Sequence, residues 1–508
     1  MEQEALPPFL PLHLLFLLAL FLLLFHRLAR DLRRAAKVPG GRALTSYPVV
    51  GCLFSFYQNR RRLLEWYTEL LGQSPTQTIV VRRLGARRTV VTASPENVEH
   101  ILRTNFHNFP KGKPFTEILG DFLGRGIFNV DGELWRSQRK LASHEFSVKS
   151  LRDYAATTLK EVVNDRLMPV LESLSAERRT VDLQELLKRL SFNMICRVSL
   201  GTEVCSLEPS LPESPLARAF DISSAICARR GAAPVSAIWR IKRRLGVGSE
   251  RELKQAVDEV HASITQLIQD RVERIVETGD RSSSSQTDLL SRLVSAGYGE
   301  EVIRDMVISF IMAGRDTTSA AMTWLFWMLS RSQEAERELI GEVDSAVGEL
   351  DYDSLKELKF LSACLCEAMR LYPPVAWDSK HAVSDDVLPD GTPIRAGDRV
   401  TYFPYGMGRM EAIWGRDRLE FKPGRWLEGT DGKHGGELKK MCPYRFPVFQ
   451  AGPRDCIGKE MAFMQMKYVV ASVLRRFEIR PVDRDDPVFV PLLTAHMAGG
   501  LPVQIRKR

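Results

Sequence analysis

The sequence predicts a mainly α-helical protein with a minor β-sheet region, in which one large folded body follows an N-terminal transmembrane anchor helix. Over most of the 508 residues, apolar side chains recur at intervals of three and four, the spacing of amphipathic helices. Runs of β-branched residues are few. One long apolar run stands near the N-terminus, and no later stretch is apolar for long enough to span a bilayer.

Residues 1–37 carry the anchor pattern. An apolar run at 9–25, dominated by Leu and Phe, is followed by the basic sequence HRLARDLRRAAK. A cleaved signal peptide would begin with basic residues and end in small ones, whereas this segment begins with acidic residues and its basic cluster comes last. We therefore expect an uncleaved single-pass anchor, and the positive-inside rule then places the folded domain, residues 38–508, in the cytosol.

The body is expected to begin after a neck formed by VPGG and Pro48, because both interrupt helices. β-branched runs predict a hairpin at 78–93, and a similar pattern predicts a second hairpin at 390–402. The remaining expected segments are helices at 150–174 and 252–277 and loops at 207–215 and 278–288.

Composition narrows the function classes. With 44% hydrophobic and 26% charged residues, the chain is globular rather than disordered. Its eight cysteines lack the paired spacing of a zinc site and are too sparse for a disulfide scaffold, which fits a reducing compartment. Lys and Arg outnumber Asp and Glu by 71 to 63, and the short basic runs suit a membrane surface or an acidic protein partner as well as nucleic acid.

The stretch FQAGPRDCIG places Cys456 just before a predicted helix at 457–477. Unpaired N–H groups and the helix dipole favour a thiolate there, which would suit it to bind iron. Gly452 and Gly458 would let the backbone approach a flat cofactor, and Arg454 could pair with a carboxylate. The alternative is an inert buried thiol, the commoner role of a lone cysteine.

The same stretch matches F-x-x-G-x-R-x-C-x-G, and it resembles the haem-binding signature of the cytochrome P-450 superfamily at every fixed position from Phe449 to Gly458. The resemblance implies that fold, and haem b bound through Cys456 as the axial thiolate. It also implies that Phe449, Gly452, Arg454 and Gly458 contact the cofactor, with Arg454 on a haem propionate.

A second segment, FIMAGRDTTSAAM at 310–322, is apolar and helical yet contains Gly314, Asp316 and Thr317. Hydroxyl side chains that bond back to a preceding carbonyl, together with Gly, favour a local opening of a helix. A helix end or a surface face is the alternative. The segment resembles the oxygen-binding part of the family, which implies that Asp316 and Thr317 are the catalytic acid and alcohol that deliver protons during dioxygen activation.

Two further motifs resemble the family. EAMR places Glu367 and Arg370 on one helical face, and FKPGRW supplies Arg425, the third member of the E-x-x-R triad, although Gly424 stands where the family often has Glu. DGELWRSQRK is a predicted helix start with Asp131 as N-cap; it sets two residues one turn apart. The resemblance makes this pair, Trp135 and Arg139, partners of the haem propionates, with Lys380 or His381 as a further candidate; a core Trp and a solvated Arg are the alternative.

Finer resemblance points to a plant branch. LGRGIFNVDGELWRSQRKLASHEFS and YGMGRMEAIWG are similar to the plant fatty-acid ω-hydroxylases of family ninety-four, and residues 47–71 to those members that oxidise jasmonoyl-isoleucine. This implies an NADPH- and O2-dependent monooxygenase that converts the C-12 carbon of jasmonoyl conjugates to 12-hydroxy and 12-carboxy products. ω-Hydroxylation of free fatty acids is the first alternative. A haem-binding protein without turnover is the second, although the intact Cys456, Asp316, Thr317 and Glu367 argue against it.

The resemblance also implies an endoplasmic reticulum membrane location, electrons from NADPH through a separate cytochrome P-450 reductase, an amphipathic carboxylate as substrate, and no nucleic acid partner. Phe115, Leu119 and residues 492–498 are candidates for lining the substrate pocket, with plain core as the alternative. The basic residues expected to dock an acidic reductase, if they are not simply solvated, are Lys439, Lys440, Arg445 and Lys459.

Overall fold

The computed structural model describes residues 47, 50–84, 86–203, 206–278, 289–346, 348–429, 436–483 and 485–508. The expected anchor at 1–37 and nearly all of the expected loop at 278–288 lie outside these residues. Within the described part of the chain, no helix is both long and apolar enough to cross a membrane.

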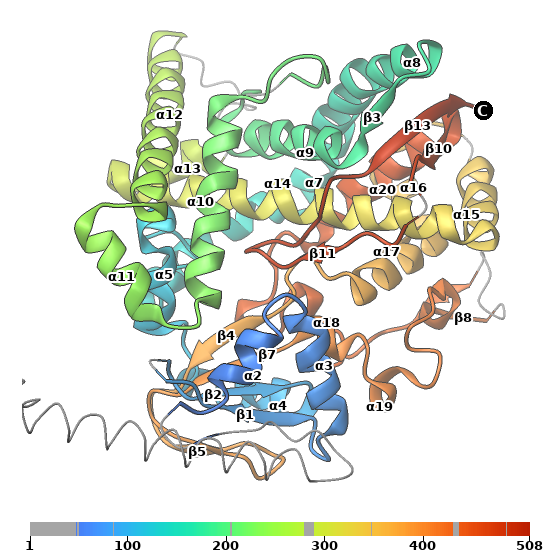
Figure 1. Cartoon of the computed structure of the whole chain (residues 1–508). Coiled ribbons are helices and arrows are strands. Elements are labelled where there is room, and N and C mark those ends of the chain that lie inside the picture. Colours follow the sequence, from blue (N-terminus) through green and yellow to red (C-terminus); the bar gives the residue numbers. More distant parts are fainter. Residues whose placement is uncertain are drawn as a thin grey trace, which may run out of the picture.

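Helices make up most of the described chain, as predicted, and the longest of them, α14 (Glu300–Arg331), runs through the middle of the molecule (Figure 1). Glu300 and Glu301 in its first turn and Arg331 in its last complement the helix dipole, and most of its length is buried. The other helices of the helical part are α5 (Gly112–Leu123), α6 (Gly132–Ala142), α7 (Val148–Tyr154), α8 (Met168–Ala176), α9 (Leu183–Leu200), α10 (Pro215–Ala232), α11 (Ser236–Leu245), α12 (Ser249–Thr278), α13 (Leu289–Ser295), α15 (Gln333–Ser345), α16 (Tyr352–Glu357), α17 (Lys359–Leu371) and α20 (Lys459–Arg476).

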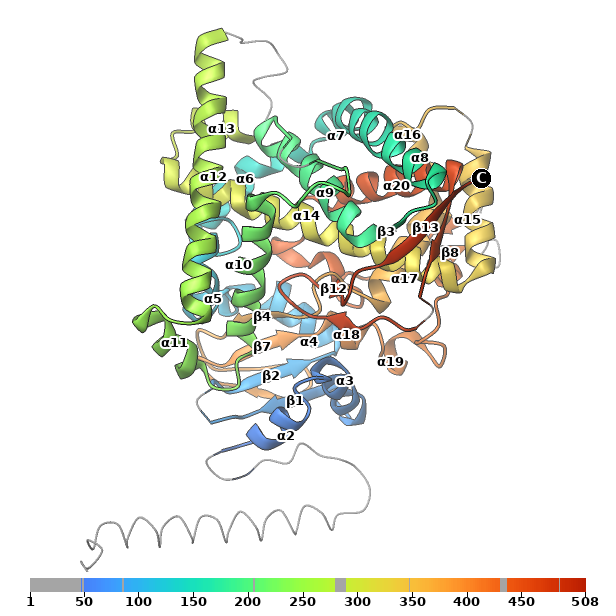
Figure 2. The same cartoon turned by 45° about the horizontal axis from the view of Figure 1, so that its top comes forward.

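The main sheet has four strands in the order β1 (Thr78–Val81), β2 (Thr89–Thr92), β7 (Arg399–Tyr402) and β4 (Asp378–His381). It lies below the helical part in both views, beside α2 (Leu53–Gln58), α3 (Leu63–Gln73) and α4 (Pro95–Glu99) (Figure 2). A second sheet joins β10 (Phe477–Pro481), β13 (Pro502–Lys507) and β3 (Thr180–Asp182). The short elements are α18 (Pro404–Met407), α19 (Glu411–Trp414) and the strand pairs β5–β6 (Asp386–Val387, Pro393–Ile394), β8–β9 (Leu427–Glu428, Glu437–Leu438) and β11–β12 (Phe489–Val490, His496–Met497).

One predicted hairpin is confirmed and the other is wrong. Residues 78–93 form the antiparallel pair β1–β2, with Thr78 opposite Thr92. Residues 390–402 contain strands that do not pair with each other: β6 pairs with β5, whereas β7 lies between β2 and β4. The strand residues were identified correctly. β7 buries three of its four residues by pairing within the main sheet, and this burial stabilises it more than pairing across a local turn would.

Both long helices are present. The segment predicted at 150–174 is helical from Val148 to Ala176, with two stretches of wider π turns, Ala155–Leu159 and Glu161–Leu167. The helix predicted at 252–277 is α12. Apolar side chains of α14 enter two large buried clusters, one shared with α9, α17 and α20 and one with α5, α10 and α12. This places α14 between the two halves of the helical core.

Candidate active site

The loop before α20 holds Cys456 by backbone contacts. The N–H of Cys456 donates to the carbonyl of Phe449 at 2.7 Å. Gly452 has a φ of 69°, and a Cβ there would lie 2.1 Å from the carbonyl oxygen of Leu102. A Cβ on Gly458 would lie 3.2 Å from the ring of Phe146. Gly452 is therefore required by its positive φ and by close protein packing, and Gly458 packs tightly against Phe146; both reasons differ from the predicted approach of a cofactor.

The Cys456 side chain retains solvent-exposed surface three residues before the start of α20. Burial of the thiol by the surrounding protein raises its pKa, and the backbone N–H of Gly458 acts in the opposite direction by donating a hydrogen bond. Ile457 packs against the apolar cluster that contains Phe310 of α14. The cysteine loop and the centre of α14 are thus joined through one apolar core.

The centre of α14 combines polar side chains with close packing. Thr317 Oγ1 donates to the carbonyl of Ala313 at 2.6 Å, the back-bonding expected from the sequence. A Cβ on Gly314 would lie 2.6 Å from Ile195, so this glycine lets α9 approach α14. Asp316 and Thr317 are half-buried, as are residues 312–314 just before them, whereas Arg315 between them is buried. Because the segment lies well inside α14, the alternative of a helix end is excluded.

Asp316 lies beside a buried cation. Arg315 is 2% exposed; its Nη1 lies 3.4 Å from Asp316 Oδ1 and donates to Asp221 Oδ1 at 2.6 Å. Burial raises the pKa of the Asp316 carboxyl, and the positive charge of Arg315 opposes this rise. Asp316 Oδ1 has no hydrogen-bond partner among the described residues. This carboxyl can therefore hold a proton at higher pH than an ordinary aspartate.

The start of α6 meets the cysteine loop. The guanidinium of Arg454 lies 4.3 Å from the ring centroid of Trp135 and donates to Asp131 Oδ1 at 2.6 Å. Arg454 Nε is buried and has no partner in the described part of the chain. Arg139 donates to the carbonyl of Asp455 at 2.7 Å and pairs with its carboxylate. The structure thus brings Trp135, Arg139 and Arg454, the three predicted partners of the propionates, together around Arg454 and Asp455.

Asp131 stands directly before α6, as predicted, but its side chain does not cap that helix. Its carboxylate accepts instead from the backbone N–H groups of Lys111 and Gly112 at the start of α5, at 3.2 and 3.0 Å. The prediction of a capping side chain was wrong because this carboxylate accepts its hydrogen bonds from α5 and from Arg454 instead of from its own helix.

The predicted triad is confirmed in geometry. Arg370 donates to both carboxylate oxygens of Glu367, at 2.8 and 2.9 Å, and Arg425 Nε donates to Oε1 at 2.8 Å. Trp426 Nε1 donates to Oε2 at 2.9 Å. The side chains of Glu367 and Arg370 are fully buried. The triad ties α17 to the segment at 418–426 that leads toward the cysteine loop.

A second buried ionic cluster was not predicted. Asp378 accepts from Lys111 Nζ and Lys380 Nζ, both at 2.8 Å, and from Gln450 Nε2 of the cysteine loop at 3.1 Å. Burial lowers the pKa of Lys380 to about 7 and that of His381 to about 4. The sequence signal for this cluster was a run of four consecutive charged or polar residues, DSKH. In the structure these four residues form β4 and are all buried, so their charges need partners.

The predicted lining residues have different positions. Phe115 lines an open cavity beside the main sheet, whereas Leu119 is 4% exposed and packs inside the core. In the segment at 492–498, β12 (His496–Met497) contacts α14.

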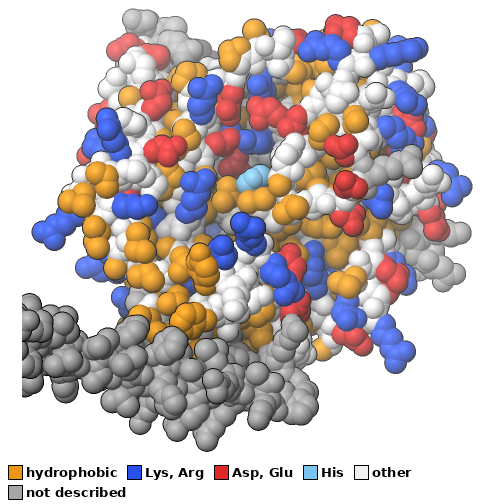
Figure 3. All heavy atoms as spheres, in the orientation of Figure 1, with side chains coloured by type: hydrophobic (Ala, Val, Ile, Leu, Met, Phe, Trp, Pro, Cys, Tyr) orange, Lys and Arg blue, Asp and Glu red, His pale blue; other side chains and the backbone are white. Residues whose placement is uncertain are grey.

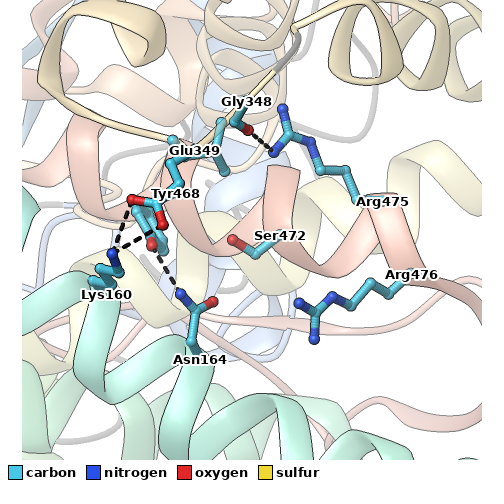
Figure 4. Close-up of a pocket in the computed structure, with 9 residues that line it drawn as sticks. Lys160, Asn164, Gly348, Glu349, Tyr468, Ser472, Arg475 and Arg476 are labelled. Atoms are coloured by element: carbon cyan, nitrogen blue, oxygen red, sulfur yellow. Dashed lines mark hydrogen bonds and ion pairs between the residues drawn. The ribbon is translucent and has the colours of Figure 1, made fainter.

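Figure 4 shows a different cavity, of about 230 Å³, lined by Lys160 and Asn164 at the π-turn stretch, by residues 348–350 and by the last turns of α20. Its charges are already satisfied, because Lys160 Nζ pairs with Glu349 at 2.8 Å and Arg475 Nη1 donates to the carbonyl of Gly348 at 3.1 Å. Arg475 lies about 24 Å along the helix from Lys459, where α20 begins after the cysteine loop. We assign this cavity no role in the active site.

Comparison with known proteins decides the family: the family model for cytochrome P450 matches residues 41–498. The chain belongs to the cytochrome P450 family. It is 59% identical to Cytochrome P450 94B3 of Arabidopsis thaliana over 464 residues, 91% of each chain, and 56% identical to Cytochrome P450 94B1 of the same plant over 492 residues, 96% of this chain and 95% of that one. It is therefore a P450 monooxygenase of the CYP94 family with a haem-thiolate cofactor.

The solved structures agree on the fold. The crystal structure of cytochrome P450DA heme domain has a TM-score of 0.75 with this P450 at 19% identity, and the match covers 92% of this chain and 97% of that one. The mainly helical P450 fold with minor sheets is thereby shown.

The residues of this P450 fit a haem on their own chemistry. The group is flat and apolar and carries two carboxylates, so it needs an accessible thiol and buried donors near its edge. Cys456 supplies the accessible thiol. Arg454 Nε, which has no partner among the described residues, is a buried donor suited to a haem carboxylate. The half-buried pair Asp316 and Thr317 adds proton-carrying groups on α14.

Proposed function

We propose that this P450 oxidises the terminal (ω, C-12) carbon of jasmonoyl-amino acid conjugates such as jasmonoyl-isoleucine, first to the 12-hydroxy and then to the 12-carboxy form, which inactivates the hormone. The resemblance of residues 47–71 to jasmonoyl-isoleucine oxidases and the 56–59% identity to 94B1 and 94B3 support this substrate. The observation that carries the reaction class is the acid and alcohol pair at Asp316 and Thr317 within buried α14.

Haem b, bound through Cys456, supplies the activation of dioxygen and the insertion of one oxygen atom into a C–H bond. Thr317 Oγ1 keeps lone pairs after donating to the Ala313 carbonyl, so it can accept a hydrogen bond; it can pass on its own proton when it releases that carbonyl. Asp316, whose pKa is raised by burial, holds a proton that it can pass on to Thr317.

We propose that Arg454 and Arg139 bind the carboxylate edge of the haem. Arg454, held over Trp135 and paired with Asp131, keeps its Nε free for a propionate. Arg139 would exchange its contact with Asp455 for the second propionate or share it. Phe449, Gly452 and Gly458 shape the loop that presents Cys456.

P450s of this kind generally need a reductase, and we propose an NADPH-dependent cytochrome P450 reductase that docks on the side of the cysteine loop. Lys440, Arg445 and Lys459 are exposed there, and Lys439 is half-buried. Their positive charges would attract an acidic surface on the reductase and orient it.

We also propose that the enzyme sits on the endoplasmic reticulum membrane with its catalytic domain in the cytosol. α11 exposes Ile238, Ile241 and Leu245 by more than half and carries Lys242, Arg243 and Arg244 in its last turn. Hydrophobic side chains gather with basic ones over α11 at the left of Figure 3. A short helix with one apolar and one basic face is suited to the surface of an anionic bilayer.

A competition assay tests the substrate. The full chain with a plant reductase and NADPH receives jasmonoyl-isoleucine, its 12-hydroxy form and lauric acid together, and the products are identified by mass. We expect the two conjugates to be oxidised preferentially, and the ratio of alcohol to acid gives the number of oxidation steps. Preferential consumption of lauric acid would replace this proposal by ω-hydroxylation of free fatty acids, and the absence of any product would favour a haem protein without turnover.

A further inference from the structure

A cavity of about 100 Å³ opens between the main sheet and the helices α5, α10 and α11. Both views place these helices next to β4 and β7 (Figures 1 and 2). Apolar groups from Phe115, Ile118 and Trp239 line it. It is also lined by five arginines, and we call it the arginine cavity: Arg83, Arg87, Arg230, Arg240 and Arg399.

Two of the five arginines are neutralised by carboxylates. Arg230 pairs with Glu250 and with Asp121, the latter at 2.8 Å. Arg240 donates to both oxygens of Glu117, at 2.8 and 2.9 Å. These side chains build the wall of the cavity, and their charges are accounted for.

Arg83 and Arg399 have no carboxylate partner among the described residues. Arg83 Nη1 is buried without any hydrogen-bond partner there, and its guanidinium stacks 3.9 Å from the ring centroid of Phe56. Arg399 Nε donates to Ser379 Oγ at 2.9 Å, and its Nη1 makes only a long contact of 3.5 Å with the carbonyl of Gly231. Both guanidiniums therefore line the cavity with donors that remain available.

The two positive charges also repel each other. Burial lowers the pKa of Arg399, the charge of Arg83 lowers it further, and the carboxylate of Asp378 offsets these effects only in part. A poorly solvated cation without a counter-charge is unfavourable, and a second cation nearby adds to the cost. An anion between the two guanidiniums would offset both their poor solvation and their mutual repulsion. Arginine binds carboxylates through paired, charge-assisted hydrogen bonds. Trp239 Nε1, buried and without a partner in the described chain, adds a third donor.

We propose that Arg83 and Arg399 bind the carboxylate of the substrate, while Phe115 and Trp239 contact the carbons next to it. The inference rests on the proposed function, because it assumes an amphipathic carboxylate substrate, and it names the residues that recognise the carboxylate. Anchored there, the substrate would present its opposite end to the haem, which is what the proposed oxidation at the terminal carbon requires.

The test compares acids with their methyl esters in the haem-loaded full-length protein in phospholipid nanodiscs. The dissociation constants of dodecanoic acid, jasmonoyl-isoleucine and both methyl esters are measured from the shift of the haem Soret band on binding. In the wild type we expect each acid to bind at least about tenfold more tightly than its ester, a difference of about 1.4 kcal/mol. In Arg83→Gln and Arg399→Gln that ratio should fall toward one, with the ester affinities unchanged.

The matched control is Arg82→Gln, which removes an exposed arginine next to Arg83 that does not line the cavity; it should keep the wild-type ratio. Arg399→Lys, which retains the charge, should keep part of the preference and shows that lost packing is not the cause. An acid-to-ester ratio in Arg83→Gln and Arg399→Gln equal to that of the wild type would overturn the proposal even if jasmonoyl-isoleucine is oxidised. Loss of the ratio in these variants without oxidation of jasmonoyl-isoleucine would support the carboxylate site and overturn the proposed hormone substrate.

Discussion

Replacement of Glu367 by Gln is the sharpest perturbation of the scaffold that holds the cysteine loop. The two carboxylate oxygens of Glu367 accept five hydrogen bonds, from Arg370 Nε and Nη2, Arg425 Nε, Trp426 Nε1 and the backbone N–H of Lys422. Glu367→Gln keeps the volume of the side chain. It turns one acceptor oxygen into a donor that faces other donors, and it leaves the charge of Arg370 without its counter-ion, whereas Arg425 keeps Asp417 at 3.3 Å.

The expected cost follows from the burial of the pair. Because the side chains of Glu367 and Arg370 are fully buried, solvent does not screen the unpaired charges. Removing one partner of a buried ion pair costs about 3–5 kcal/mol. Native proteins are stable by only about 5–15 kcal/mol, so the variant should lose a large part of its free energy of unfolding.

Urea denaturation of the purified protein, followed by tryptophan fluorescence and by haem absorbance, measures this loss. The control is Glu349→Gln, since Glu349 is largely exposed and pairs with an exposed lysine; its unfolding curve should match the wild type. A free energy of unfolding for Glu367→Gln within about 1 kcal/mol of the wild type would refute the reasoning, because a relaxed or hydrated network would then replace the lost charge.

Four further outcomes are expected. Cys456→Ser should fold but lose the ferrous–carbonyl absorption band typical of thiolate ligation, whereas an unchanged band would exclude Cys456 as the ligand. Thr317→Ala should lower the yield of product per NADPH by about tenfold or more, measured by product and cofactor consumption in parallel. Gly314→Ala should destabilise the fold by about 1–3 kcal/mol because its Cβ would lie 2.6 Å from Ile195, and Ile195→Ala in the same chain should recover part of the loss in urea unfolding. Burial lowers the pKa of His381 to about 4 from 6.5, so the folded chain binds fewer protons than the unfolded one between these values; stability should rise by about 3 kcal/mol from pH 4 to pH 6.5, and His381→Gln should flatten this rise.

The motifs predicted the family because each is carried by residues close together in the sequence. The residues around Cys456 predicted a loop followed by a helix, and those around Asp316 predicted a helix; the structure contains both. The hairpin at 78–93 was correct for the same reason, since its strands pair with each other. The hairpin at 390–402 failed because β7 takes its partners, β2 and β4, from other parts of the chain.

The charge balance inside the fold was beyond sequence patterns. Asp378 lies 267 positions from Lys111 in the sequence, and only the folded chain brings their side chains to 2.8 Å. Arg83 follows β1 and Arg399 begins β7, far apart in the sequence, and nothing in the sequence distinguishes them from the exposed Arg82. Burial and the lack of a counter-ion, which give these residues their significance, are properties of the tertiary structure.

The position of the inserted oxygen tests the central claim most directly. The full chain with reductase and NADPH oxidises jasmonoyl-isoleucine under ¹⁸O₂, and mass spectrometry locates the label in the product. This account predicts one labelled oxygen atom on the terminal carbon of the jasmonoyl chain in the first product. A label within the chain, in the ring or in the isoleucine part, or a product oxygen that comes from water, would contradict it.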